Sequence, residues 1–133
     1  MTGFGTLGAT LILACVGYYL PHGAEEKVFA ELTAAVHHNF DIGRDDIFFS
    51  PVRGIEEDAA REGDGLAPPL PEAYITTRGK TWQIRSVDNE REIGFLEDRP
   101  VPDRLPPEYT RFVKLRGPYG LFQGSCKEVQ NSE

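Results

Sequence analysis

The first long apolar stretch of the chain lies at residues 4–20, which carry no charged side chain. Its second part, residues 10–20, is rich in β-branched and aromatic side chains, and this composition predicts a buried central strand. The whole stretch is short for a membrane span, contains three glycines, and follows no Lys or Arg. We therefore expect neither a membrane helix nor a signal peptide here.

Residues 24–38 show a different pattern. Val28, Leu32 and Val36 recur at four-residue steps, and charged side chains lie between them. This spacing predicts an amphipathic helix that places one face on a sheet.

Shorter segments complete the expected elements. Strands are predicted at residues 47–52, 74–77 and 93–96, a short helix or strand at 82–87, and a short helix at 108–115 that opens after two prolines. Residues 55–69 combine acidic side chains with Gly and Pro, which predicts a flexible acidic loop.

The composition limits the kind of partner. The chain has 133 residues and a net charge of −7, so long-range attraction to phosphate backbones or anionic lipids is not expected, and a basic protein surface is the better partner. Cys15 and Cys126 match no metal-binding spacing and are expected to be unpaired apolar fillers in a reducing compartment. This favours a cytoplasmic protein.

Metal chemistry and hydrolase chemistry find no support in the spacing of the side chains. His37 and His38 are adjacent, and neighbouring positions on a helix point about 100° apart, with no third ligand nearby. Ser50, Ser86 and Ser125 lie in no recognisable motif with His and Asp. We therefore expect no metal, no cofactor and no enzymatic activity.

Several short motifs follow one another along most of the chain. They are residues 23–28 with Leu32, residues 49–52, Leu70-Pro71 with Tyr74, and residues 81–82, 85–87, 94–96 and 98–102. Their order resembles the amino-terminal domain of the NusG family, bacterial transcription elongation factors that include RfaH-like paralogues. The chain departs from the family at Cys15-Val16, where the family usually carries Trp-Tyr.

The resemblance implies an α+β fold: a mixed or antiparallel four-stranded sheet flanked by helices, with a short carboxy-terminal hairpin or tail. Residues 1–9 would be a flexible lead-in, residues 10–116 the domain with its acidic loop at 55–69, and residues 117–133 a vestige of the family's second module, the KOW barrel. Too few residues follow position 117 to close such a barrel.

The resemblance also implies a function. The expected role is that of a monomeric transcription elongation or antitermination factor, which binds the clamp helices of bacterial RNA polymerase and modulates pausing or termination. It would stabilise one polymerase state by binding that state more tightly, with no small-molecule substrate and no membrane contact. The non-template DNA strand is a further hypothetical partner.

Three groups of residues carry this hypothesis. The polymerase-binding patch comprises aromatic and aliphatic anchors, and the opposite-lobe contact comprises a polar turn. The third group would contact DNA. The patch is Tyr18, Leu70, Tyr74, Ile75, Trp82, Phe95 and Leu96; the turn is Arg78, Gly79, Lys80 and Thr81; the DNA contacts are His22, Lys27 and His38.

Two alternatives belong to other classes. A strand, helix and strand order is also found in small enzymes of the tautomerase type, but these use an amino-terminal proline as base, and the chain starts Met1-Thr2 with Pro21 internal. The apolar start instead suits an accessory subunit of a larger complex, including one attached to a membrane.

Overall fold

The computed structural model describes residues 11–55, 65–68, 70–118 and 120–129. The regular structure of these residues is entirely β-strand, and they contain no helix that could cross a membrane. The strands are β1 (Leu11–Pro21), β2 (Val28–Asn39), β3 (Arg44–Phe49), β4 (Val52–Gly54), β5 (Gly65–Ala67), β6 (Ala73–Arg78), β7 (Thr81–Ser86), β8 (Glu92–Asp98), β9 (Arg111–Arg116) and β10 (Gly120–Val129).

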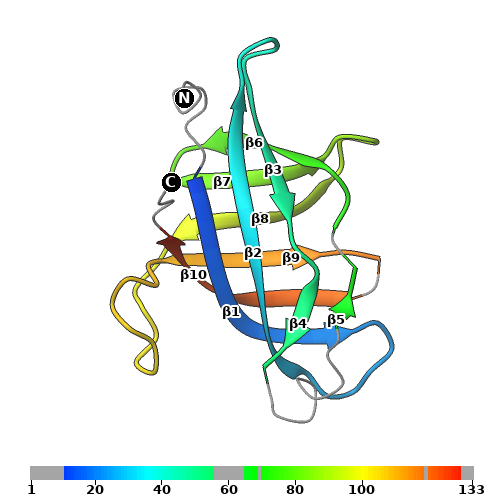
Figure 1. The fold of residues 1–133 in the computed structure, drawn as a ribbon, viewed down its shortest axis with the longest axis vertical. Coiled ribbons are helices and arrows are strands. Elements are labelled where there is room, and N and C mark those ends of the chain that lie inside the picture. Colours follow the sequence, from blue (N-terminus) through cyan, green and yellow to red (C-terminus); the bar gives the residue numbers. More distant parts are fainter. Residues whose placement is uncertain (1–10, 56–64, 69, 119, 130–133) are drawn as a thin grey trace.

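Eight of these strands close into an antiparallel barrel in which neighbours along the chain are neighbours in the sheet (Figure 1). The order runs from β1 through β2, β3, β6, β7, β8 and β9 to β10, which pairs again with β1. In Figure 1, β1 and β2 cross in front of β7, β8 and β9. The expected α+β fold is therefore wrong, because the sheet closes on itself and no helix flanks the described strands.

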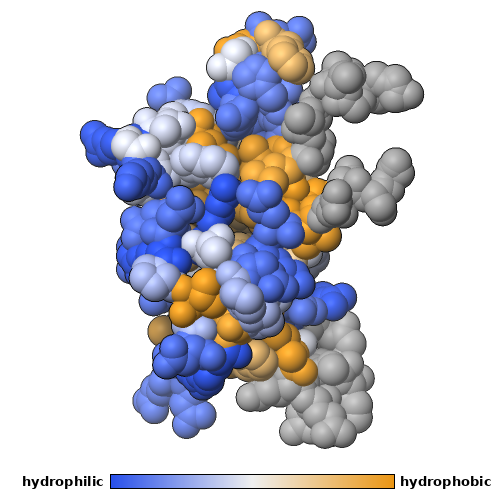
Figure 2. Space-filling model, turned by 90° about the vertical axis from the view of Figure 1, so that its left-hand side faces the viewer, coloured by the Kyte–Doolittle hydropathy of each residue, from blue (hydrophilic) through white to orange (hydrophobic). Residues whose placement is uncertain are grey.

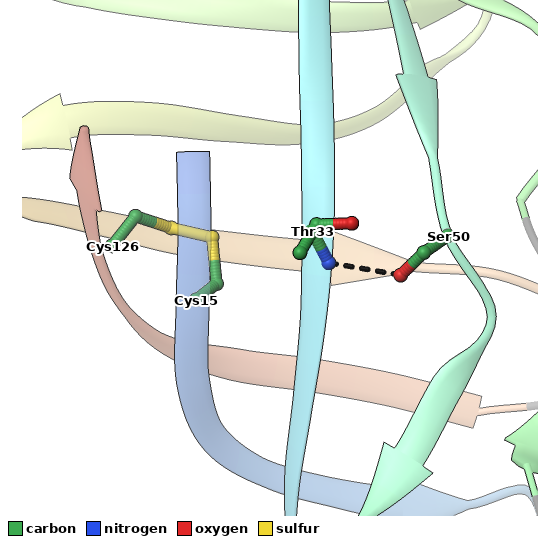
Figure 3. Close-up of a disulfide and its surroundings, with 4 residues drawn as sticks. All are labelled: Cys15, Thr33, Ser50 and Cys126. Atoms are coloured by element: carbon green, nitrogen blue, oxygen red, sulfur yellow. Dashed lines mark hydrogen bonds between the residues drawn. A yellow bond between two sulfur atoms is a disulfide. The ribbon is translucent and has the colours of Figure 1, made fainter. Parts of the chain in front are cut away.

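A short ribbon of β4 and β5 extends the sheet beyond the barrel. β3 and β4 pair one after the other with β2, and the strand is interrupted between them at Ser50-Pro51, although the chain is continuous. Pro51 has no N–H to donate. At this break Ser50 N donates to Thr33 O at 2.9 Å, and Ser50 Oγ accepts from Thr33 N at 2.9 Å (Figure 3).

Side chains alternate between the barrel interior and its outer wall, as the pleat requires. An eight-stranded barrel is narrow enough for side chains to fill, and here the inward positions are apolar and closely packed. The buried residues include Leu13, Cys15, Tyr19, Ala30, Leu32, Ala34, Val36, Ile47, Phe49, Ala73, Ile75, Ile84, Leu96, Val113, Leu115, Phe122 and Cys126.

The helix predicted at residues 24–38 is a strand, β2, for a simple reason. Val28, Leu32 and Val36 share one face at a period of two as well as at a period close to 3.6. Ala30 and Ala34 decide between the two, and both are buried on the same face as their larger neighbours. Small alanines gave no strong apolar signal, so the strand pattern resembled a helix.

The other elements fall into confirmed and corrected groups. Strands at residues 10–20, 74–77 and 93–96 are confirmed as β1, β6 and β8. The helix predicted at 108–115 is wrong, since residues 111–116 form strand β9, on which Val113 and Leu115 face the barrel interior. The expected vestigial tail contains β10, a full barrel strand. The lead-in at residues 1–9 and most of the loop at 55–69 lie outside the described residues.

A disulfide joins the first and last barrel strands. Cys15 and Cys126 lie directly opposite each other in β1 and β10, with their Cα atoms 4.0 Å apart and an S–S bond between them (Figure 3). Both residues are almost fully buried. The expectation of two unpaired cysteines is therefore wrong, and with it falls the reason for assigning a reducing compartment.

We expect replacement of both cysteines by alanine to lower the free energy of unfolding by about 2–5 kcal/mol, because the bond closes a long loop in the unfolded chain. The sequence separation is 111 residues. Chemical denaturation of the wild type and of Cys15→Ala/Cys126→Ala measures the change. A reducing agent should lower the stability of the wild type alone; equal stability of both proteins without reductant would contradict a bonded pair.

A second expectation concerns alkaline pH. Tyr19 is buried, and desolvation raises the pKa of its hydroxyl above the usual value of 10.0. The unfolded chain therefore loses this proton first, so the contribution of Tyr19 to stability is constant below about pH 10 and is lost as the pH rises further. Urea unfolding across this range should show that the free energy of unfolding falls less with rising pH for Tyr19→Phe than for the wild type. An equal decrease in both proteins would show that Tyr19 plays no part.

Candidate ligand-binding groove

A groove of about 550 Å³ lies on the outer wall of the barrel. It is formed by β1, β2, β9 and β10 together with the segment that links β8 to β9, the large loop at the left of Figure 1. This volume falls within the range of about 300–1,000 Å³ that is usual for small-molecule sites. The lining residues are Val16, Gly17, Tyr18, Phe29, Pro102, Arg104, Leu105, Phe112, Gln123, Gly124 and Ser125.

Aromatic rings form the walls of the groove. Tyr18 and Phe29 are directly opposite each other in β1 and β2, and their ring centroids are 5.6 Å apart. Phe112 stands on β9, with its ring 5.9 Å from that of Phe95. The strand pleat places these rings on the outer wall because their neighbours in sequence, including Tyr19 and Val113, occupy the interior.

Two glycines form the part of the floor where β1 and β10 meet. Gly17 and Gly124 are register partners. A Cβ atom on Gly17 would lie 2.1 Å from the Gln123 carbonyl oxygen, and one on Gly124 would lie 2.2 Å from the Val16 carbonyl oxygen. Only glycine permits this approach of the two backbones, so the pair allows close contact at the seam and leaves this part of the floor without side chains.

The segment between β8 and β9 is held in place by its own backbone. Arg99 N donates to Thr110 O at 3.0 Å and closes its base, while Leu105 N donates to Pro102 O at 3.0 Å. Prolines at 100, 102, 106 and 107 restrict the backbone dihedrals of the segment. It therefore presents Pro102 and Leu105 to the groove from a stiff frame.

Polar groups are few in the groove. Gln123 and Ser125 come from β10, and Arg104 is the one charged side chain in the lining. Lys27 adds a second positive charge outside the lining itself, with its Nζ atom 4.8 Å from the centroid of the Tyr18 ring. The site is thus a mostly apolar, aromatic groove bordered by cations.

A smaller cavity, about 340 Å³, lies at one end of the barrel. Arg111 faces inward there, with its guanidinium 4.6 Å from the Trp82 ring centroid and its Nη2 atom 3.1 Å from the Glu128 carboxylate. Its buried Nη1 has no hydrogen-bond partner among the described residues. Lys80 and Leu96 also line this cavity.

The residues of the expected polymerase-binding patch are spread around the barrel. Tyr18 lines the groove, whereas Trp82 and Leu96 lie at the smaller cavity. Ile75 and Leu96 are 9% and 2% exposed, which places both in the core and out of reach of a partner. Leu70 packs against the core, Tyr74 stacks on Arg44, and Phe95 contacts Phe112.

The polar turn and the expected DNA contacts also lie in separate places. Arg78 ends β6, Gly79 and Lys80 form the turn, and Thr81 begins β7. Lys27 lies over Tyr18, and His22 is exposed in the turn after β1. His38 Nδ1 lies 2.7 Å from the Asp45 carboxylate, near the tip of the β2–β3 hairpin.

That hairpin carries its own exposed apolar side chains. Phe40 is 67% exposed and Ile42 is 55% exposed at its tip. The tip is at the top of the molecule in Figure 1, and in Figure 2 the same end shows a small hydrophobic patch among hydrophilic residues. They lie far from the groove along β2, and they do not contribute to its lining.

Sequence reasoning missed most of the groove. Phe29 falls within the helix predicted at residues 24–38 and Phe112 within the helix predicted at 108–115, and Arg104 and Leu105 fall in a connection with no predicted element. The one available signal was the pairing of Tyr18 with Phe29 across a hairpin, which requires residues 28–39 to be a strand. Among the described residues no group of three or more His, Cys, Asp or Glu side chains could hold a metal ion.

The glycine floor gives a test of the seam. We expect Gly124→Ala to lower the free energy of unfolding by about 3 kcal/mol, because its Cβ meets backbone that cannot move aside. Gly23→Ala is the control: it meets no atom within 4 Å and has only the cost of a positive φ of 83°, about 1–2 kcal/mol. Thermal or urea unfolding compares the two, and an equal loss would contradict the close approach of the strands.

No family model, curated protein or solved structure matches this chain. The likeness to the NusG family therefore rests on short sequence motifs alone. Function has to be inferred from the geometry of the barrel and its groove.

Proposed function

We propose that this protein is a ligand-binding module that holds a mostly apolar, ring-containing ligand in the groove on its outer wall. The observation that carries the proposal is the combination of size and lining: about 550 Å³ bounded by Tyr18, Phe29 and Phe112, with few polar groups. Concave sites that are largely apolar, with a small number of polar groups to fix orientation, are the usual form of small-molecule sites.

The energetic basis is the removal of apolar surface from water. Aromatic rings prefer tilted or offset contacts with other rings, which contribute about 0.5–1.5 kcal/mol beyond the area buried. Tyr18 and Phe29 already adopt a tilted pair, with an interplanar angle of 48°. A planar ligand entering between this pair and Phe112 would extend the same kind of contact.

The groove favours binding without large rearrangement. Its floor is part of the barrel, its aromatic walls stand on paired strands, and its outer border is the proline-containing segment. A site built in advance loses less conformational entropy when it binds. The expected affinity for a ligand of two or three rings is on the order of micromolar.

The disulfide adds a proposal about the environment. Buried disulfides persist mainly where conditions are oxidising, and Cys15–Cys126 connects the strands whose pairing forms the groove floor. We infer that the protein works in an oxidising compartment. This replaces the cytoplasmic location, whose premise was unpaired cysteines.

Polymerase binding stays a prediction from the NusG-like motifs. It was inferred together with an α+β fold that the described residues do not have, and two residues of its patch are buried. A pull-down for the large polymerase subunits tests it separately from the groove.

The groove is tested with the neutral fluorescent probe N-phenyl-1-naphthylamine. We expect one probe per protein, and a dissociation constant raised about tenfold by Phe29→Ala or Phe112→Ala, because each removes one aromatic wall. Phe48→Ala is the matched control, since Phe48 is 46% exposed on β3 and does not line the groove. No saturable binding, or an equal effect of all three substitutions, would contradict the proposal.

A further inference from the structure

We infer that the ligand of the groove is an organic anion: an apolar, ring-containing body that carries a carboxylate or a similar acidic group. This inference rests on the proposed function, because it concerns the chemistry of the same site. It follows from the position of the cations around the groove, on a protein whose overall charge is of the opposite sign.

The one charge in the lining of the groove is positive, and two further cations lie over its aromatic walls. Arg104 is the one ionised residue of the lining, and no Asp or Glu lines it. Lys27 reaches over the Tyr18 ring at 4.8 Å, and Arg99 lies over the Phe112 ring with its guanidinium carbon 3.9 Å from the centroid. Two walls of the groove are thus each covered by a cation.

Two of these cations are available to a ligand. Arg99 is paired with the Glu97 carboxylate, so its charge is largely compensated. Lys27 and Arg104 make no ion pair with any residue in the described parts of the chain. They come from different elements, the turn before β2 and the segment between β8 and β9. Arg104 lines the groove, and Lys27 lies over Tyr18, one of its walls.

The net charge of −7 does not cancel this local preference. Charges more than about 8–10 Å away are largely screened at physiological ionic strength. A carboxylate in the groove therefore interacts mainly with the groups that border it, and cations next to an apolar site attract it more strongly than they would in open water. Arginine also offers several N–H donors in a plane suited to a carboxylate.

The side chains of the floor extend the same chemistry. Ser125 is only 7% exposed, and Gln123 stands next to the glycine floor on β10. Both can donate a hydrogen bond to an oxygen of the ligand. An organic acid would therefore place its rings against Tyr18, Phe29 and Phe112 and its acidic group toward Lys27 and Arg104.

The test compares two probes of nearly the same shape. N-phenyl-1-naphthylamine is neutral, and 1-anilinonaphthalene-8-sulfonate is the corresponding anion. The measurement is made at about 0.15 M salt, where distant charges are screened. We expect Lys27→Gln/Arg104→Gln to lower the affinity for the anionic probe about five- to tenfold and to change the affinity for the neutral probe less than about twofold.

The control removes the same charge elsewhere. Arg78→Gln/Arg116→Gln takes away two exposed cations that do not line the groove, and it should leave both probes unchanged. If both double variants lose the same affinity for the anionic probe, or if neither loses any, while the neutral probe still binds, this inference is overturned and the proposed function stands. Failure of the neutral probe to bind the wild type overturns the proposed function, and the inference with it.

Discussion

The pairing of β1 with β10 is the constraint on which the rest of the structure depends. It runs from Ile12 opposite Val129 to Pro21 opposite Gly120, and it turns an open meander into a closed barrel. Without it, two long strands would expose their backbone donors and acceptors at an edge. The disulfide and the glycine pair lie within this seam, so covalent linkage and close backbone approach act on the same two strands.

Closure of the seam decides where a ligand can be held. The interior is occupied by the core, in which Phe122 and Leu13 are among the largest fully buried side chains. The groove lies instead on the outer wall, and its floor takes Val16 and Gly17 from one side of the seam and Gly124 and Ser125 from the other. The site therefore exists only while the barrel is closed, which ties recognition to the integrity of the fold.

The sequence was sufficient for some strands and insufficient for the architecture. Continuous β-branched and aromatic runs identified β1, β6 and β8 correctly. β2 was mistaken for a helix because a four-residue step fits both periodicities when alanine occupies the intermediate inward positions. That one error hid the hairpin that pairs Tyr18 with Phe29, and with it the groove. Arg104 and Leu105 could not be assigned because a connection between strands carries no periodic pattern. The disulfide was not predicted because two cysteines far apart in sequence meet only when the first strand pairs with the last.

The position of the disulfide has a mechanical consequence. A pulling force applied at the two ends of the chain would pass through residue 15, across the sulfur atoms and out through residue 126. The polypeptide between these residues would carry no tension, so most of the barrel and the whole segment bordering the groove would be shielded from stretching for as long as the bond is intact.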